Sequence, residues 1–413
     1  MSDLQFAIRH SPFAIRFIPG GVTAAHGFRA SGVSAGIKRL RKPDLALVVA
    51  DEPATAAAVF TTNRILAAPV LISRRRLRSG TARAVLINSG CANCLTGAAG
   101  TQDALTVSRT AARELGVAER HVLLASTGVI GRRLPVRRIV RAIPRLVQRL
   151  SRGHHTAAAE AILTTDAQVK EAAAEALIGG RVCRVGGMAK GAGMIAPSMA
   201  TMLCVITTDV AIAPALLRVL LQQATERTFN RISVDGEMST NDTVFVLASG
   251  ASGVTVRRGT PSGRIVAEML EMVSRRLAHL IVDDGEGATQ MAEIRVVGAR
   301  TAREAQACAR QVANSPLVKT MLAGGDPNVG RIAAAVGASP ARFDPQKLDV
   351  FIGHQRVIAG GAALRFTKAA FRELLAHPQV ELLIRLHAGG AEGRMLTCDL
   401  TEEYVRINAR YST

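Results

Sequence analysis

The chain has 413 residues, of which 48% are apolar, and its formal net charge is +20. The apolar content allows a large core and excludes a disordered chain. No apolar run reaches the ~18 residues that a membrane-spanning helix needs, so a membrane span is not expected.

Hydrophobic patterning predicts strands and helices that alternate along the chain. The expected strands are 45–50, 57–61, 84–88, 122–125, 205–210, 243–247 and 294–297. The expected helices are 102–115, 136–150, 214–225, 266–281 and 302–314, while 157–163 fits a helix or a strand. Gly116 is expected to end one helix, and Pro144 to kink or break another. The alternation indicates an α/β or α+β fold with a mixed sheet.

Six cysteines are too few for a disulfide scaffold in a chain of this length. Cys91-Ala-Asn-Cys94 has the spacing of half a zinc site, but no second pair accompanies it. We therefore interpret these two cysteines as part of a turn, predict no metal site, and expect a reducing cytoplasmic location.

The segment from Lys190 to Leu203 has the pattern of a self-cleaving enzyme precursor. Glycines and Pro197 precede Ala200 and Thr201, and an apolar run follows from Met202. Taken alone, a threonine in this setting more often simply begins a strand. Cleavage between Ala200 and Thr201 would make Thr201 an N-terminal nucleophile, whose α-amine, with a pKa of about 8 in peptides, can serve as its base. This hypothesis divides the chain into an alpha fragment, 1–200, and a beta fragment, 201–413.

Other motifs along the chain carry a wider resemblance. They include Pro19-Gly-Gly-Val-Thr23, Val59-Phe-Thr-Thr-Asn63, Ser126-Thr-Gly-Val-Ile-Gly131, Thr164-Thr-Asp166, Ser239-Thr-Asn-Asp242, Asp284-Gly-Glu-Gly-Ala-Thr289, Asp326-Pro-Asn328 and Ile407-Asn-Ala-Arg-Tyr-Ser-Thr413. In these motifs and their order the chain resembles the ornithine acetyltransferase family, the bifunctional glutamate N-acetyltransferases of arginine biosynthesis. The resemblance covers about Pro19 to the last residue.

The resemblance implies an α/β fold of the N-terminal-nucleophile type, a layered α/β/β/α sandwich with mixed sheets. It also implies a ping-pong transfer of acetyl from N2-acetyl-L-ornithine to L-glutamate through an acetyl-Thr201 enzyme. No cofactor is expected, although some members of the family also accept acetyl-CoA as donor. The expected assembly is a heterotetramer of two alpha and two beta fragments, without nucleic acid or membrane partners.

Specific site residues follow from the same resemblance. Acyl transfer needs an oxyanion hole, and the family places it on Thr127 and Gly128, after a predicted strand. The family's substrate contacts match Thr164, Lys190, Thr201, Glu286, Asn408 and Thr413, and Thr165 remains an alternative to Thr164. Lys190 would suit a substrate carboxylate, and Glu286 the ornithine ammonium. Asp235, Asn241 and Asp242 are interpreted as support for the site, since such residues usually form turns.

Two other functions remain open from the residues. A self-cleaving aminopeptidase or amidohydrolase would use the same nucleophile but release free acids. A nucleic-acid or membrane-surface protein would use the basic half, because residues 1–200 hold 28 Lys and Arg against 11 Asp and Glu. Arginines recur at helical spacing between residues 138 and 152, but aromatic residues for base stacking make up only 3% of the chain. A solvated basic face is the simpler interpretation.

The chain departs from the family pattern at three places. Cys91-Ala-Asn-Cys94 stands where an Asn-Ala-Asn type of segment is usual, and Gln290 and Val329 stand where Lys and Trp are expected. None of these removes a predicted catalytic group, so they put only fine substrate preference in question.

Overall fold

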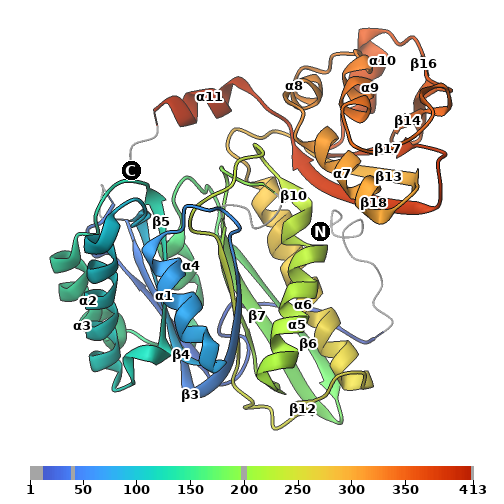
Figure 1. Ribbon diagram of the computed structural model, residues 1–413. Coiled ribbons are helices and arrows are strands. Elements are labelled where there is room, and N and C mark those ends of the chain that lie inside the picture. Colours follow the sequence, from blue (N-terminus) through green and yellow to red (C-terminus); the bar gives the residue numbers. More distant parts are fainter. Residues whose placement is uncertain (1–12, 39–41, 197–201, 411–413) are drawn as a thin grey trace.

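The computed structural model describes residues 13–38, 42–196 and 202–410 (Figure 1). A larger unit carries most of the chain, and a smaller unit is built from the segment that runs from β13 (Met291–Ala299) to β18 (Ala391–Cys398). Among the described residues, no helix combines the length and apolar character needed to cross a membrane.

One mixed sheet organises the larger unit, and nine strands of the described chain belong to it. In spatial order they are β1 (Arg16–Ile18), β6 (Lys170–Ile178), β7 (Arg181–Lys190), β8 (Leu203–Thr208), β11 (Thr243–Ala248), β3 (Leu45–Phe60), β4 (Thr81–Cys91) and β5 (Val122–Val129), with β2 (Phe28–Val33) paired to β3.

Strand β3 joins two halves of this sheet. Its first part, residues 45–50, pairs with β2 and β4, and its last part, 55–60, pairs with β11. The register with β4 shifts between Val49 and Ala54, as at a β-bulge, which bends a strand and increases its twist. The two strands expected at 45–50 and 57–61 are therefore one long strand.

Three large buried cores are described in the larger unit, and they separate the layers of an α/β/β/α sandwich, as the resemblance implied. One core lies between the β2–β5 half and three helices, α1 (Ala68–Arg76), α2 (Gly97–Leu115) and α3 (Val136–Gln148). A second lies between the two halves of the sheet and includes α4 (His155–Ile162). The third lies under α5 (Pro214–Arg227) and α6 (Pro261–Asp283), which cover β6, β7, β8 and β11.

Local signals set the helix ends. Gly116 follows α2 in the left-handed conformation with φ 65°, which glycine adopts at little cost, so the predicted C-cap is confirmed. Pro144 lies inside α3, which continues to Gln148, so the proline does not end the helix.

The smaller unit has its own sheet and core. In spatial order the sheet contains β18 (Ala391–Cys398), β13 (Met291–Ala299), β17 (Gln379–Arg385), β14 (Asp349–Ile352), β15 (Gln355–Ala359) and β16 (Ala362–Ala363). The short strand β10 (Ile232–Ser233), from the larger unit, pairs with β18 at the edge of this sheet. Its helices are α7 (Ala302–Ala313), α8 (Pro316–Gly324), α9 (Gly330–Gly337) and α10 (Lys368–Leu374). In the larger unit, β9 (Ala211–Ile212) and β12 (Thr255–Val256) form a separate two-stranded sheet.

After β18 the chain returns to the larger unit as α11 (Glu402–Ala409), drawn in red in Figure 1. The predicted division at residues 200 and 201 falls between β7 and β8, which are neighbouring antiparallel strands with Lys190 opposite Leu203. Two fragments divided there would share one sheet.

Candidate active site

A cavity of about 140 Å³ lies where the ends of β4, β5 and β7 meet. Its walls come from residues far apart in the sequence. They are Ala92, Thr127, Gly128, Ile130, Thr164, Thr165, Lys190, Gly193, Met194, Ser239, Asn241, Glu286 and Asn408.

One side of the cavity is backbone from the parallel strands β4 and β5, which place Gly128 opposite Gly90. Gly128 has φ +126°, and a Cβ atom there would lie 2.4 Å from the carbonyl carbon of Gly90. Only glycine therefore fits at this position. The amide of Asn241 donates hydrogen bonds to the carbonyl oxygens of Ala92 (2.7 Å) and Ser126 (2.8 Å), which holds the strand ends together.

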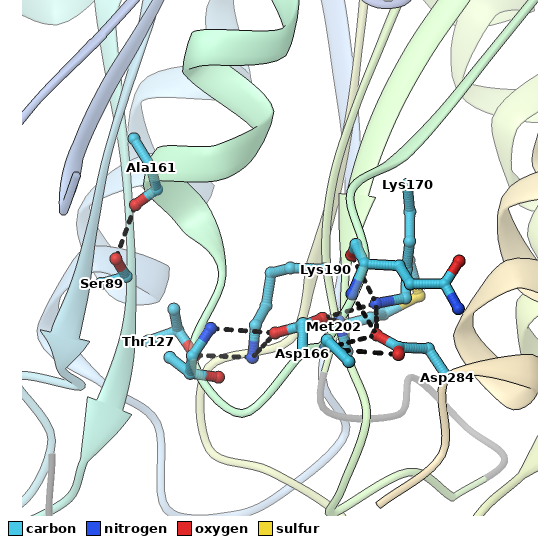
Figure 2. Close-up of polar contacts among 12 residues, drawn as sticks. Ser89, Thr127, Ala161, Asp166, Lys170, Lys190, Met202 and Asp284 are labelled. Carbon is cyan, nitrogen blue, oxygen red and sulfur yellow. Dashed lines mark hydrogen bonds and ion pairs between the residues drawn. The ribbon is translucent and has the colours of Figure 1, made fainter. Parts of the chain in front are cut away.

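Lys190, the last residue of β7, reaches this backbone side from the opposite direction. Its side chain is buried, and Nζ donates to Oγ1 of Thr127 at 3.3 Å. A carboxylate oxygen of Asp166 lies 3.9 Å from the same Nζ (Figure 2). Burial lowers the pKa of Lys190, and Asp166 acts in the opposite direction. The ammonium has only these two side-chain neighbours among the polar contacts of the described residues.

Behind Lys190 lies a buried charge network. Lys170 donates to Oδ1 of Asp166 at 2.8 Å and also to Asp284 (Figure 2). Burial opposes ionisation of Asp166, but the charges of Lys190 and Lys170 outweigh it and lower the pKa of Asp166. The carboxylate is therefore ionised at neutral pH.

Glu286 and Asn408 close another side of the cavity. The Glu286 backbone N–H donates to the carbonyl oxygen of Ala192 at 2.8 Å, and its carboxylate packs against Gly193, where a Cβ atom would lie 2.3 Å from Oε2. Nδ2 of Asn408, on α11, donates to Oε2 of Glu286 at 2.7 Å. The C-terminal helix thus contributes directly to the cavity.

Asp242 directly precedes β11 and contacts Met202, the residue before β8. Its Oδ1 accepts the backbone N–H of Met202 at 3.0 Å, and the carboxyl group is fully buried. Burial raises the pKa of Asp242 well above its usual range. Ala200, Thr201 and Thr413 lie outside the described residues, so the predicted nucleophile is represented only by its neighbour in the chain, Met202.

The described members of the predicted site lie together. Thr127, Gly128, Lys190, Glu286 and Asn408 all line the cavity, as do both Thr164 and Thr165. Asn241 is part of the wall, and Asp242 lies behind it. Sequence reasoning missed two charged groups of the network, Asp166 as a partner of Lys190 and Lys170 as a partner of Asp166. The signal for them was a Lys four residues after an Asp, which is common on any surface.

The cysteines take no part in the cavity. All six are free and buried, and Sγ of Cys91 donates to the carbonyl oxygen of Arg132 at 3.3 Å. Cys94 packs with Ala67 and Val70 in a small apolar cluster. Within the described ranges, no group of three or more His, Cys, Asp or Glu side chains is placed to hold a metal ion.

Comparison with known proteins supplies the family. The profile of the ArgJ family matches residues 29–413, nearly the whole chain. The chain belongs to the ArgJ family. This confirms the resemblance found in the motifs, because the family profile and the curated ArgJ proteins match almost the whole chain.

Relatives in the ArgJ family match almost end to end. The arginine biosynthesis bifunctional protein ArgJ of Thermosynechococcus vestitus is 45% identical, over 96% of this chain and 99% of that protein. The protein of the same name from Symbiobacterium thermophilum is also 45% identical, over 97% and 100%. A chloroplastic ArgJ from Citrullus lanatus is 45% identical, over 96% and 89%. The chain is thus a member of a family of bifunctional arginine-biosynthesis enzymes.

Solved structures are similar over parts of the ArgJ chain. Ornithine acetyltransferase from Mycobacterium tuberculosis, complexed with ornithine, is 42% identical, covering 45% of this chain and 98% of that chain, with a TM-score of 0.42. ArgJ from Bacillus halodurans is 36% identical, covering 46% and 97%, with a TM-score of 0.42.

Proposed function

We propose that this chain is a self-cleaving acetyltransferase that moves the acetyl group of N2-acetyl-L-ornithine to L-glutamate through an acetyl ester on Thr201. The observation that carries the proposal is the meeting of Thr127, Gly128, Lys190 and Glu286 at one small cavity. An acyl amino acid with a cationic side chain requires donors for the oxyanion, a cation for its carboxylate and an anion for its ammonium group. Membership of the ArgJ family supports the same reaction.

The first step is cleavage of the chain. Oγ of Thr201 attacks the carbonyl carbon of Ala200, the peptide C–N bond breaks, and an ester and a free α-amine result. Water then hydrolyses the ester, which leaves Ala200 as a carboxylate and restores the Thr201 hydroxyl. The fragments stay together because β7 and β8 remain paired from Val185 with Thr208 to Lys190 with Leu203.

Acyl transfer then uses the new N-terminus. The α-amine of Thr201 takes the hydroxyl proton while Oγ attacks the acetyl carbon of N2-acetylornithine. Donors at Thr127 and Gly128 stabilise the tetrahedral oxyanion, whose C–N bond breaks as the proton passes to the leaving nitrogen. The α-amine of glutamate attacks the acetyl ester in turn, N-acetylglutamate forms, and Oγ regains a proton. One amide replaces another, so the reaction needs no ATP and no cofactor.

Substrate recognition follows from charge. The ammonium of Lys190 binds the substrate α-carboxylate, and Glu286 binds the ornithine side-chain ammonium, with Asn408 holding the Glu286 carboxylate in place. Thr164 or Thr165 and the C-terminal Thr413 complete the contacts. Acetyl-CoA is proposed as a second acetyl donor, to be tested by direct assay.

We also propose a heterotetramer of two alpha and two beta fragments, located in the cytoplasm. The six free cysteines are compatible with a reducing compartment. Sedimentation of the purified protein tests the assembly, because a single alpha–beta pair would contradict it.

Intact mass and N-terminal sequencing test the cleavage. We expect two fragments, the second beginning Thr-Met-Leu-Cys. Thr201→Ala should stay uncut and lose about 10⁴-fold or more in activity, as with other nucleophile deletions. Thr201→Ser keeps a hydroxyl and is the matched control, expected to be cut. A single uncut polypeptide with full activity would refute the proposal.

An acetyl-transfer assay separates the main alternative. Incubation with N2-acetylornithine and glutamate should give ornithine and N-acetylglutamate in equal amounts. Free acetate that forms at the same rate with or without glutamate would instead indicate an amidohydrolase.

A further inference from the structure

Lys170 is a buried cation that the proposed reaction leaves without a role. It is the first residue of β6, its side chain is 1% exposed, and it does not line the cavity. An ammonium group is removed from water at high cost unless carboxylates surround it. Lys170 has two such partners, Asp166 and Asp284 (Figure 2).

Each of these two aspartates lies in a loop that lines the cavity and accepts backbone N–H groups there. Asp166 accepts the backbone N–H of Thr164 at 2.9 Å and that of Gly191 at 2.6 Å, one residue after Lys190. Asp284 accepts the backbone N–H of Ala167 at 3.1 Å and begins the turn that contains Glu286. Lys170 therefore ties the Thr164 loop to the Glu286 turn, although it is 114 positions from Asp284 in the sequence.

The distances also show which of the two lysines is the closer partner of Asp166. Asp166 lies 2.8 Å from Nζ of Lys170 but 3.9 Å from Nζ of Lys190. Two ammonium groups and two carboxylates balance within this buried network. Without Lys170, the ionised Asp166 would have Lys190 as its remaining ion-pair partner among the described residues, and a buried carboxylate binds the nearest cation strongly.

We propose that Lys170 is a positioning residue that engages Asp166 and Asp284 together, so that the ammonium of Lys190 stays available for the carboxylate of the substrate. The inference rests on the proposed function, in which Lys190 binds that carboxylate. Lys170 itself touches no substrate, and its effect passes through Asp166.

Two double variants with the same net charge test this inference. Lys170→Met with Asp284→Asn removes the cation and leaves Asp166 ionised beside Lys190. Lys170→Met with Asp166→Asn also removes the cation, but leaves Lys190 without its ion-pair partner. Each pair loses one positive and one negative group, and each changes an Asp that accepts backbone N–H groups, so the pairs are matched in charge and in bonding.

The readout is the KM for N2-acetylornithine in each variant, after circular dichroism has shown that it folds. We expect KM for the variant that keeps Asp166 to exceed KM for the variant that keeps Asp284 by about tenfold or more, the usual effect of losing a hydrogen bond to a charged group. A merely structural role for Lys170 predicts equal values. Equal KM values, or the reverse order, would overturn the inference.

Single substitutions of Lys170 test the same inference if the double variants do not fold. Lys170→Gln keeps a buried hydrogen-bond donor without the charge and should raise KM by a similar factor, whereas Lys170→Arg should restore most of the affinity. An unchanged KM in folded Lys170→Gln overturns the inference. Its failure is distinct from failure of the proposed function, because the latter would appear as absent acetyl transfer in the unmodified protein.

Discussion

One side of the cavity is backbone from the ends of β4 and β5, whereas the opposite side is made of buried charged groups. The backbone side depends on the close approach of Gly128 to Gly90 and on the amide of Asn241. The charged side depends on a balance between two lysines and two aspartates. The first should be sensitive to volume and indifferent to pH, and the second should be the reverse.

The largest effect is expected at Gly128. In Gly128→Ala the new Cβ atom would lie 2.4 Å from the Gly90 carbonyl carbon and 2.5 Å from the Cys91 nitrogen. The strands must separate, so the oxyanion donors move, and kcat should fall by about 10²–10³.

Gly131→Ala is the control for that prediction. Gly131 also has a positive φ, +84°, but a Cβ atom at this position would meet no other atom of the described residues within 4 Å. The variant should therefore show only the conformational cost, about 1 kcal/mol of unfolding free energy, and keep kcat. If both variants lose kcat equally, close approach is not what matters at Gly128.

The next effect tests the charged side. Lys190→Met keeps the length of the side chain but removes the ammonium, so KM for N2-acetylornithine should rise by about tenfold or more while the fold persists. Lys38→Met is the matched loss of one charge. Lys38 is half-buried, donates to the carbonyl oxygen of Pro43 at 2.7 Å, and has a pKa lowered to about 8, chiefly by burial. A similar rise in KM for both would indicate a general field rather than a contact.

A smaller effect is expected at Asn241. Asn241→Ala leaves the carbonyl oxygens of Ala92 and Ser126 without the amide, and should lower the unfolding free energy by about 2 kcal/mol and also reduce kcat. Ser89→Ala loses one buried hydrogen bond, to the carbonyl oxygen of Ala161 at 2.6 Å (Figure 2), and should lower stability alone. Urea unfolding measures the unfolding free energy and initial rates measure kcat. Equal kcat losses in the two variants would contradict the role of Asn241 in holding the strand ends at the cavity.

The last prediction concerns stability instead of activity, and it distinguishes the two buried carboxyl groups of Asp242 and Asp166 by their pH dependence. The pKa of Asp242 in the folded chain is raised by burial, whereas an unfolded Asp titrates at about 3.9. As pH rises from about 4 to 7 the unfolded chain loses this proton and the folded chain keeps it, so the wild-type protein loses stability. Asp242→Asn removes that loss, so its unfolding free energy relative to wild type should increase over this range, by about 1.4 kcal/mol for each pH unit in which only the unfolded chain is ionised.

Asp166→Asn supplies the contrast for that measurement. The pKa of Asp166 is lowered in the folded chain, so its contribution is present above about pH 4 and disappears only as the pH falls below that value. The variant should show no relative gain between pH 4 and 7. A gain in both variants would mean that neither pKa direction explains the pH dependence.

Strong local patterns made parts of this fold predictable. The apolar spacing of 266–281 gave α6 its position, because Val266, Met269, Leu270, Val273 and Leu277 form its buried face. The α2 end followed from Gly116 alone. The site residues came from motifs, and those that the structure describes do line one cavity.

Other parts could not be predicted locally. Strand β6 has the sequence Lys-Glu-Ala-Ala-Ala-Glu-Ala-Leu-Ile, whose residues favour helices, and no element was expected there. It is extended because β1 and β7 pair with it on both sides, and such pairing overrides propensity.

The order of residues alone identified the family, the main helices and the groups that the chemistry requires. The folded chain was needed to show that Lys170, Asp166 and Asp284 meet behind Lys190, and that Asn408 reaches Glu286 across 122 positions. Local patterns act over a few residues, whereas the buried charges are balanced by contacts between segments that are distant in the chain and meet only in the folded state.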